Sequence, residues 1–146
     1  MPTRQNNRYF VSLMFNLTLD HVTMTETKPI RVLIADDFGP FLDSLRQVIN
    51  TLAGLEAVGA ARDGEEILAL CKQLQPDVVL MDINMPVMDG VVATRLIKQR
   101  WPHIRIIGLT GYDELDRTQE LIDAGACMCL SKTTSASELQ KQLIKQ

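Results

Sequence analysis

Five polar side chains of this sequence stand at or just after the ends of short apolar segments. They are Asp36 and Asp37 after residues 30–35, Asp82 after 78–81, Thr110 after 104–109, and Lys132 after 127–130. Three carboxylates held close together repel one another and raise their pKa values, and a hard cation relieves that repulsion. Because every ligand would be an oxygen atom, the expected ion is Mg²⁺, with Mn²⁺ as the alternative.

The same groups suit the transfer of a phosphoryl group. A metal ion, the ammonium of Lys132 and the hydroxyl of Thr110 would together stabilise the charge on a transferring phosphoryl group. A carboxylate can itself be the nucleophile and form an acyl phosphate. Asp82 is the best candidate for this role, because it follows the expected central strand and is followed by a polar loop, INMP.

Each of these residues also has a simpler interpretation when it is taken alone. Asp36 or Asp37 could cap a helix that begins at Pro40, Thr110 could bond to the backbone at a strand end, and Lys132 could be a solvated loop lysine. The prediction of a shared site therefore depends on their coincidence at one edge of one sheet.

The chain reads as five strand–helix units, which is the pattern of an α/β fold. The expected strands are residues 30–35, 55–60, 78–81, 104–109 and 127–130, each a short apolar run, and an amphipathic segment follows each one. Unbroken apolar strands that alternate with helices predict a parallel sheet covered on both faces, in an open, doubly wound arrangement of Rossmann or flavodoxin type. In such sheets ligands bind at the carboxyl ends of the strands, which is where the five polar residues stand.

Capping signals predict where the helices begin. Asp63 and Ser135 each have a glutamate three residues later, as in a capping box. Asp113 is expected to cap the fourth helix, whose apolar face would include Leu115, and Val92 is expected on the apolar face of the third.

Composition limits the class of protein and its partners. The chain has 146 residues, 46% of them hydrophobic and 23% charged, with a net charge of −3. A mildly acidic surface argues against direct binding of nucleic acid or of an anionic membrane. The odd number of cysteines (Cys71, Cys127 and Cys129) is interpreted as buried free thiols in a reducing cytoplasm. A metal site at these cysteines is less favoured, because only His21 and His103 could complete it.

Residues 1–28 are interpreted as a mobile or appended N-terminal extension, and one domain is expected to fill residues 29–146. The apolar run from Tyr9 to Leu19 is too short to cross a bilayer as a helix. Its alternation of apolar and polar residues is strand-like, and the segment after it, DHVTMTET, lacks the small-residue pattern of signal-peptide cleavage.

Four stretches of the sequence resemble the receiver domain of bacterial two-component response regulators, the CheY-like superfamily. They are VLIADDFGPF, PDVVLMDINMPVMDG, IIGLTGYD and AGACMCLSK, so that the resemblance covers essentially all of residues 29–146. It implies a flavodoxin-like (βα)5 fold with strand order 2-1-3-4-5. It also implies a signalling domain that accepts a phosphoryl group from a sensor histidine kinase or a phosphotransfer protein.

The resemblance assigns a role to each site residue. Asp82 would be the phosphoacceptor, and Asp37 and Asp82 would bind Mg²⁺ together with the backbone carbonyl of Asn84. Asp36 would act on the metal through water. Thr110 and Lys132 would each contact a phosphoryl oxygen, and Thr110 would shift toward the phosphoryl group. No glycine-rich nucleotide loop is found in the sequence, so ATP is not the expected donor.

The sequence departs from the family at the switch and at the output. Cys129 stands where the family often has an aromatic residue, which leaves Tyr112 as a candidate substitute in the switch. Thr133 follows the lysine, as in receivers that carry a LuxR-type DNA-binding output. Because Gln146 ends the chain just after the last expected helix, both a stand-alone receiver and part of a longer regulator are compatible with it. The expected output and dimerisation face comprises the helix from residue 113, strand 127–130 and the helix from residue 135.

Two other functions fit part of the pattern. The departure at Cys129 would suit a receiver-like interaction module that works without phosphorylation. A phosphatase of the haloacid dehalogenase type also uses a strand-end aspartate, but it needs a second one two residues on, where this chain has Asn84. We therefore expect no turnover of external substrates, and only the domain's own phosphorylation and slow dephosphorylation, with Asn84 and Tyr112 tuning the lifetime.

Overall fold

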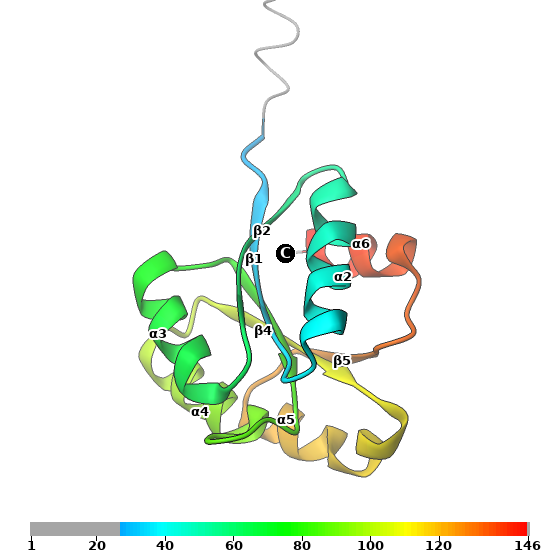
Figure 1. The fold of residues 1–146 in the computed structure, drawn as a ribbon. Helices are drawn as coiled ribbons and strands as arrows, with labels where there is room; N and C mark the ends of the chain where they lie inside the picture. The colour runs from blue at the N-terminus through cyan, green and yellow to red at the C-terminus, as the bar shows by residue number, and fades with distance from the viewer. Residues whose placement is uncertain (1–26, 146) are drawn as a thin grey trace, which may run out of the picture.

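Five parallel strands form the centre of the molecule. The computed structural model describes residues 27–145, so that the predictions for the extension, including its apolar run, lie outside the described residues. The strands are β1 (Ile30–Ala35), β2 (Leu55–Ala61), β3 (Val78–Asp82), β4 (Arg105–Thr110) and β5 (Met128–Ser131). Their order in the sheet is β2-β1-β3-β4-β5, which confirms the predicted flavodoxin-like topology and places β3 at the centre (Figure 1).

Helices cover both faces of this sheet. They are α2 (Gly39–Thr51), α3 (Gly64–Leu74), α4 (Gly90–Arg100), α5 (Thr118–Ala124) and α6 (Ala136–Ile144), and a 3₁₀ helix, η1 (Tyr112–Arg117), precedes α5. Helices α2 and α6 lie on one face, and α3, α4 and α5 lie on the other (Figure 1). Within residues 27–145, no helix is both long enough and apolar enough to cross a membrane.

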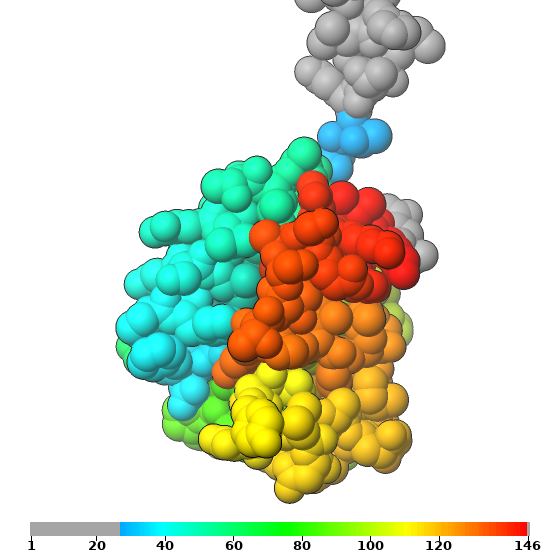
Figure 2. All heavy atoms as spheres, turned by 90° about the vertical axis from the view of Figure 1, so that its right-hand side faces the viewer, coloured from blue at the N-terminus to red at the C-terminus, as the bar shows by residue number. Residues whose placement is uncertain are grey.

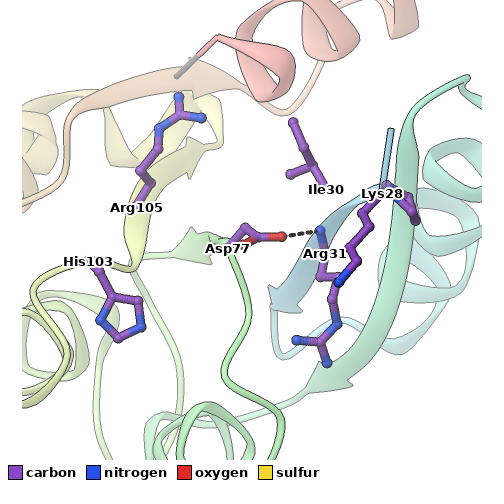
Figure 3. A pocket seen from close by; sticks show the side chains of 7 residues that line it. Lys28, Ile30, Arg31, Asp77, His103 and Arg105 are labelled. Atoms are coloured by element: carbon purple, nitrogen blue, oxygen red, sulfur yellow. Dashed lines mark hydrogen bonds between the residues drawn. The ribbon is translucent and has the colours of Figure 1, made fainter. Parts of the chain in front are cut away.

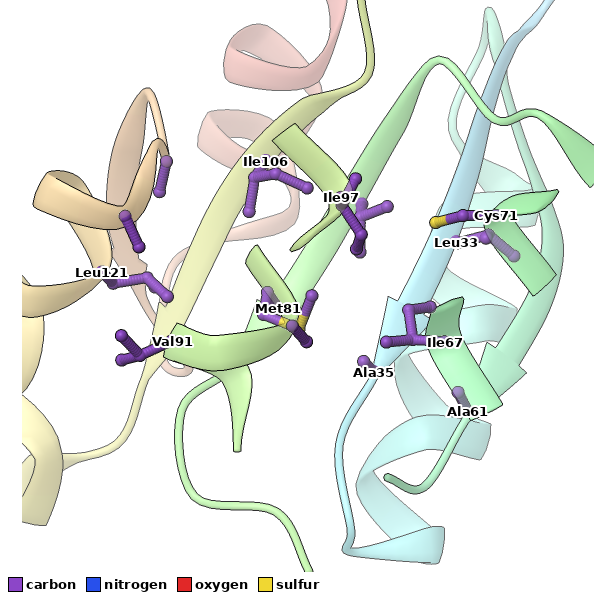
Figure 4. Close-up of a cluster of buried hydrophobic side chains, with 14 of the residues drawn as sticks. Leu33, Ala35, Ala61, Ile67, Cys71, Met81, Val91, Ile97, Ile106 and Leu121 are labelled. Atoms are coloured by element: carbon purple, nitrogen blue, oxygen red, sulfur yellow. The ribbon is translucent and has the colours of Figure 1, made fainter. Parts of the chain in front are cut away.

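Two apolar layers, one on each face of the sheet, hold these helices in place. Alternate residues of a strand point to opposite faces, so Leu33 packs with α3 and α4 whereas Ile34 packs with α2 and α6. Figure 4 shows the first of these layers, which includes Ile67 of α3, Ile97 of α4 and Leu121 of α5. All five residues of β3 are buried, which explains why its sequence is a continuous apolar run before Asp82.

The helix caps follow the predictions at two positions. Asp63 accepts a hydrogen bond from the backbone N–H of Glu66 at 2.8 Å, and Ser135 accepts one from the N–H of Glu138 at 3.2 Å. The Glu66 carboxylate accepts from the N–H of Arg62, one residue before the cap, instead of from the cap residue itself.

The segment after β4 differs from the prediction. Residue Gly111, in extended conformation, caps η1, so Asp113 lies inside the first turn instead of before it. The 3₁₀ helix turns in three residues instead of 3.6, which rotates Leu115 out to 59% exposure and brings Glu114 inward. Val92, predicted to be buried on α4, is 40% exposed, and Ala93 and Thr94 are buried in its place.

The three cysteines are free thiols, as predicted, but they are not all buried. Cys71 is buried in the core, and this burial raises the pKa of its thiol to about 12. Cys129 is half-buried, and burial, followed by the neighbouring Cys127, raises the pKa of its thiol as well. Cys127 is exposed, and β5 begins one residue later, at Met128, instead of at Cys127 as predicted.

Candidate metal centre

Strand register brings the predicted site residues to one edge of the sheet. Ala35 pairs with Met81, and Asp82 pairs with Leu109. Asp36 therefore follows β1 beside the end of β3. On the other side, Thr110 pairs with Ser131 of β5, and the N–H of Lys132 donates to the carbonyl of Thr110 at 3.0 Å. The carboxyl ends of β1, β3, β4 and β5 thus form a single rim, as the sequence predicts.

Lys132 is the cation at the centre of this rim. Its Nζ lies 2.7 Å from Asp36 Oδ2 and 3.1 Å from Asp82 Oδ1, and 3.8 Å from Oε1 of Glu114. The aromatic ring of Phe41 lies beneath the ammonium, with its centroid 5.3 Å from Nζ. Lys132 is thus a half-buried bridging residue and not a solvated loop lysine.

One lysine does not balance the carboxylates around it. Asp36 and Asp82 are only 0% and 2% exposed, and Glu114 is buried beside them. Burial, and then the negative charges of Asp36 and Glu114, raise the pKa of Asp82 to about 7, although Lys132 acts in the opposite direction. Burial lowers the pKa of Lys132, but the carboxylates of Asp36 and Asp82 outweigh it and raise that pKa above its usual value. The rim is therefore short of positive charge.

The acidic residues of the rim fit a divalent cation. One carboxylate oxygen from each of Asp36, Asp37 and Asp82 lies within 4.8 Å of the other two. Asp36 Oδ2 is buried and, apart from its ion pair with Lys132, accepts no hydrogen bond from the described residues. Oxygen ligands of this kind suit a hard ion such as Mg²⁺. Asp37 is exposed, so the metal position would open to solvent.

Close backbone packing fixes the loop between β3 and α4, which begins directly after Asp82. The carboxylate of Asp82 accepts from the N–H of Ile83 at 2.9 Å, and the N–H of Gly90 donates to the carbonyl of Ile83 at 2.7 Å. A Cβ at Gly90 would collide with the carbonyl oxygen of Asp82. At the other end of the loop, the N–H of Gly64 donates to the carbonyl of Met88, and a Cβ at Gly64 would collide with that oxygen. Both glycines are required by this approach of backbone to backbone.

The three predicted switch residues are not packed together in this structure. The hydroxyl of Thr110 is directed to the backbone carbonyl of Leu130, at 3.4 Å, and not to Asp82. Cys129 is half-buried against Gly108, whereas Tyr112 is 90% exposed at the start of η1. Their roles in a switch stay predictions.

The structure adds residues that the sequence interpretation missed. Glu114 of η1 enters the rim, and Arg117 of η1 donates to the side-chain oxygen of Asn84 at 2.9 Å. Arg62, after the edge strand β2, donates to the carbonyl of Asp37 at 3.1 Å. A signal for Glu114 was present, because it stands three residues after Gly111 as the N3 glutamate of a capping box does.

A hollow lies at the opposite edge of the sheet from the rim, and the charged side chains that line it have roles in the fold. Its volume is about 410 Å³, and its charged side chains include Arg31, Asp77 and Arg105 (Figure 3). Asp77 accepts from the N–H of Arg31 at 2.8 Å. The guanidinium of Arg31 donates to the last carbonyls of α3, and that of Arg105 donates to carbonyls near the end of α6. These charges complete helix ends.

The fold and the rim together define a doubly wound α/β domain with an acidic, lysine-bridged centre at the carboxyl edge of its sheet. The chain belongs to the response regulator receiver domain family, which matches residues 32–144. The predicted receiver is thereby confirmed, and its LuxR-type relatives include a two-component response regulator of the LuxR family from Aurantimonas sp. SI85-9A1, 28% identical with a TM-score of 0.71, covering 78% of this chain and 81% of that one.

The curated relatives include regulators longer than this chain. It is 33% identical over 117 residues to the response regulator protein VraR of Staphylococcus saprophyticus, covering 80% of this chain and 56% of VraR. It is 41% identical over 110 residues to the transcriptional regulatory protein YxjL of Bacillus subtilis, covering 75% and 50%. The chain thus spans about half the length of the curated relatives that it matches.

Solved structures agree with the fold. The response regulator domain of Thermotoga maritima CheB is 31% identical with a TM-score of 0.72, covering 80% of this chain and 94% of that one. A chain in the CheX–CheY–BeF3–Mg²⁺ complex of Borrelia burgdorferi is 25% identical with a TM-score of 0.72, covering 80% and 88%.

Proposed function

We propose that this receiver domain accepts a phosphoryl group on Asp82 in the presence of Mg²⁺. The observation that carries the proposal is the bridge from Lys132 to both Asp36 and Asp82, at 2.7 and 3.1 Å, in a rim with too little positive charge. A structural ion pair would need only one carboxylate. Here several carboxylates surround one lysine, so that the excess negative charge can bind a metal ion, which in turn can bind an incoming phosphoryl group.

In the proposed step, a carboxylate oxygen of Asp82 attacks phosphorus and forms a new O–P bond. With a phosphohistidine donor, the P–N bond breaks, its electron pair stays on the imidazole nitrogen, and that nitrogen takes up a proton. Asp37, Asp82 and the carbonyl of Asn84 would hold Mg²⁺, with Asp36 acting through water, and the ion would lower the pKa of Asp82 and neutralise charge on the phosphoryl oxygens. Lys132 would pair with a phosphoryl oxygen, and Thr110 would turn from Leu130 to donate to another.

The family and its relatives support the choice of partners. The donor would be a sensor histidine kinase or a phosphotransfer protein, and the domain would catalyse no reaction of an external substrate. We also propose that residues 29–146 are the receiver domain, that residues 1–28 are an extension of it, and that the protein works in the cytoplasm. The output would be a downstream protein or a DNA-binding domain, as the names of the relatives suggest, with α5, β5 and α6 as the output and dimerisation face.

A second candidate function is binding of a partner without phosphorylation. The hydroxyl of Thr110 is directed to β5, and the half-buried Cys129 stands where the family often has an aromatic residue. Such a module would bind its partner equally well whether or not Asp82 carries a phosphoryl group.

Intact-mass spectrometry tests the main proposal. Incubation with acetyl phosphate and Mg²⁺ should add the mass of one phosphoryl group, and EDTA or Asp82→Asn should abolish the addition. Asp113→Asn is the matched control, because Asp113 is an exposed aspartate near the rim and its substitution should leave labelling intact. The proposal would be refuted by a native protein that gains no mass, or by an equal gain in Asp82→Asn.

A further inference from the structure

Glu114 is the one buried carboxylate of the rim to which neither the metal site nor the proposed phosphoryl transfer gives a role. It belongs to η1, far from Asp82 in sequence, and it is only 7% exposed. Its Oε2 accepts a hydrogen bond from the backbone N–H of Asn84 at 3.2 Å. Its Oε1 accepts one from the N–H of Gly111 at 3.3 Å and lies 3.8 Å from Nζ of Lys132.

The partners of this carboxylate are groups that would otherwise be available to an anion on Asp82. Asn84 is two residues beyond Asp82, and its N–H points to Glu114 at the same rim where Lys132 contacts Asp82. A carboxylate and a phosphoryl group both accept hydrogen bonds through negatively charged oxygens. The carboxylate of Glu114 therefore lies beside the phosphoacceptor and occupies hydrogen-bond donors that would also suit phosphoryl oxygens.

We propose that Glu114 is an internal competitor for the phosphoryl position, and that phosphorylation of Asp82 expels its carboxylate and displaces η1. The inference rests on the proposed phosphorylation of Asp82. In this inference, Glu114 slows phosphorylation of Asp82. Its displacement also links the new charge at the rim to a movement at the protein surface.

Electrostatics give the direction of this change. A phosphoryl group brings a charge of about −1.5 to −2 into a rim where Lys132 already faces three carboxylates. Glu114 would then be a buried like charge next to the new group. Asp82 ends β3 and Asp36 directly follows β1, whereas Glu114 belongs to a short 3₁₀ helix that can shift without disturbing the sheet. The carboxylate packs closely against the backbone of Gly111, since a Cβ there would lie 3.2 Å from Oε1 of Glu114.

Movement of Glu114 must be transmitted along η1. At the end of this helix, Arg117 donates to Oδ1 of Asn84 at 2.9 Å and pairs with Asp89 at 3.3 Å, so that Glu114 and Arg117 both connect η1 to the loop after Asp82. On the outer side of η1, Tyr112 is 90% and Leu115 is 59% exposed. Figure 2 shows the segment that includes η1 (yellow) on the surface next to the segment after β5 (orange). A shift of η1 would therefore change an exposed apolar surface to which a partner could bind.

The first test is the rate of phosphorylation by acetyl phosphate with Mg²⁺, compared for the wild type, Glu114→Gln and Asp113→Asn. Glu114→Gln removes one like charge from the rim and should raise the rate at least about fivefold. Asp113→Asn removes the same charge from the adjacent exposed position and should change the rate by less than about twofold. Equal rates for the wild type and Glu114→Gln would overturn the inference while leaving phosphorylation of Asp82 intact. No phosphorylation of any of the three proteins would refute both proposals.

The second test observes the displacement itself by NMR. Addition of beryllofluoride and Mg²⁺ to the wild type should shift the backbone amide signal of Gly111, which loses its hydrogen bond to Glu114. In Glu114→Ala the Gly111 signal should be shifted before any addition and should respond less to it. A wild type that binds beryllofluoride with an unchanged Gly111 signal would contradict the inference.

Discussion

Replacement of Asp82 by asparagine should stabilise the metal-free protein at alkaline pH. The pKa of Asp82 is raised from 3.8 to about 7 by burial and by Asp36 and Glu114. Between about pH 4 and pH 7 the folded protein therefore holds a proton that the unfolded chain has lost. Stability falls as the pH rises through this window, and the penalty is complete above the folded pKa. An asparagine side chain cannot ionise, so the variant avoids the penalty.

The size of the effect follows from the shift. A difference of about 3 pKa units corresponds to about 4 kcal/mol at 1.36 kcal/mol per unit. Part of this energy belongs to the cluster of charges around Asp82 and not to Asp82 alone, because the negative charges of Asp36 and Glu114 contribute to the shift. We therefore expect Asp82→Asn to raise the free energy of unfolding by about 2–4 kcal/mol near pH 8, and by less than about 1 kcal/mol near pH 4.

Urea unfolding in EDTA, followed by the fluorescence of Trp101, measures this effect, because Trp101 is the single tryptophan of the chain. Asp113→Asn should leave stability unchanged at both pH values, since that side chain is exposed. Added Mg²⁺ should stabilise the wild type more than Asp82→Asn. A variant that is less stable than the wild type at pH 8, or that gains equally at both pH values, would refute the electrostatic account of the rim.

Three further substitutions test the elements that hold the rim. Lys132→Gln leaves the buried carboxylates without a cation, so it should cost about 3–5 kcal/mol in EDTA near pH 8 and less near pH 5, as measured by urea unfolding. Gly90→Ala should lower stability by about 1–3 kcal/mol and reduce labelling of Asp82, because its Cβ collides with the Asp82 carbonyl; a stable, fully labelled variant would contradict this. Asp63→Ala should cost about 1 kcal/mol through loss of the cap on Glu66, with no change in labelling.

The resemblance to the receiver family supplied the strand order, but the parallel sheet and most of the rim could be predicted from the residues themselves for a simple reason. In a parallel sheet each strand is a short apolar run, and all strands end at the same edge, so residues that follow the runs must meet. That argument places Asp36, Asp82 and Lys132 correctly, and the structure joins them through ion pairs.

Glu114 could not be placed in this way, because it follows no strand directly. Whether Asp113 or Glu114 faces inward depends on the extended conformation of Gly111 and on a 3₁₀ turn, and apolar periodicity does not distinguish a 3₁₀ turn from an α turn over six residues. The direction of the Thr110 hydroxyl depends on one side-chain rotation, which no pattern of residue types specifies.

The most direct test of the central claim is to locate the phosphoryl group chemically. After treatment with acetyl phosphate and Mg²⁺, reduction with borohydride converts an acyl-phosphorylated aspartate to homoserine, which peptide mass spectrometry assigns to a position. The account predicts homoserine in place of Asp82 alone, and none there when Mg²⁺ is withheld. Homoserine in place of Asp36 or Asp37 instead of Asp82, or at no position in a protein that binds Mg²⁺, would contradict it.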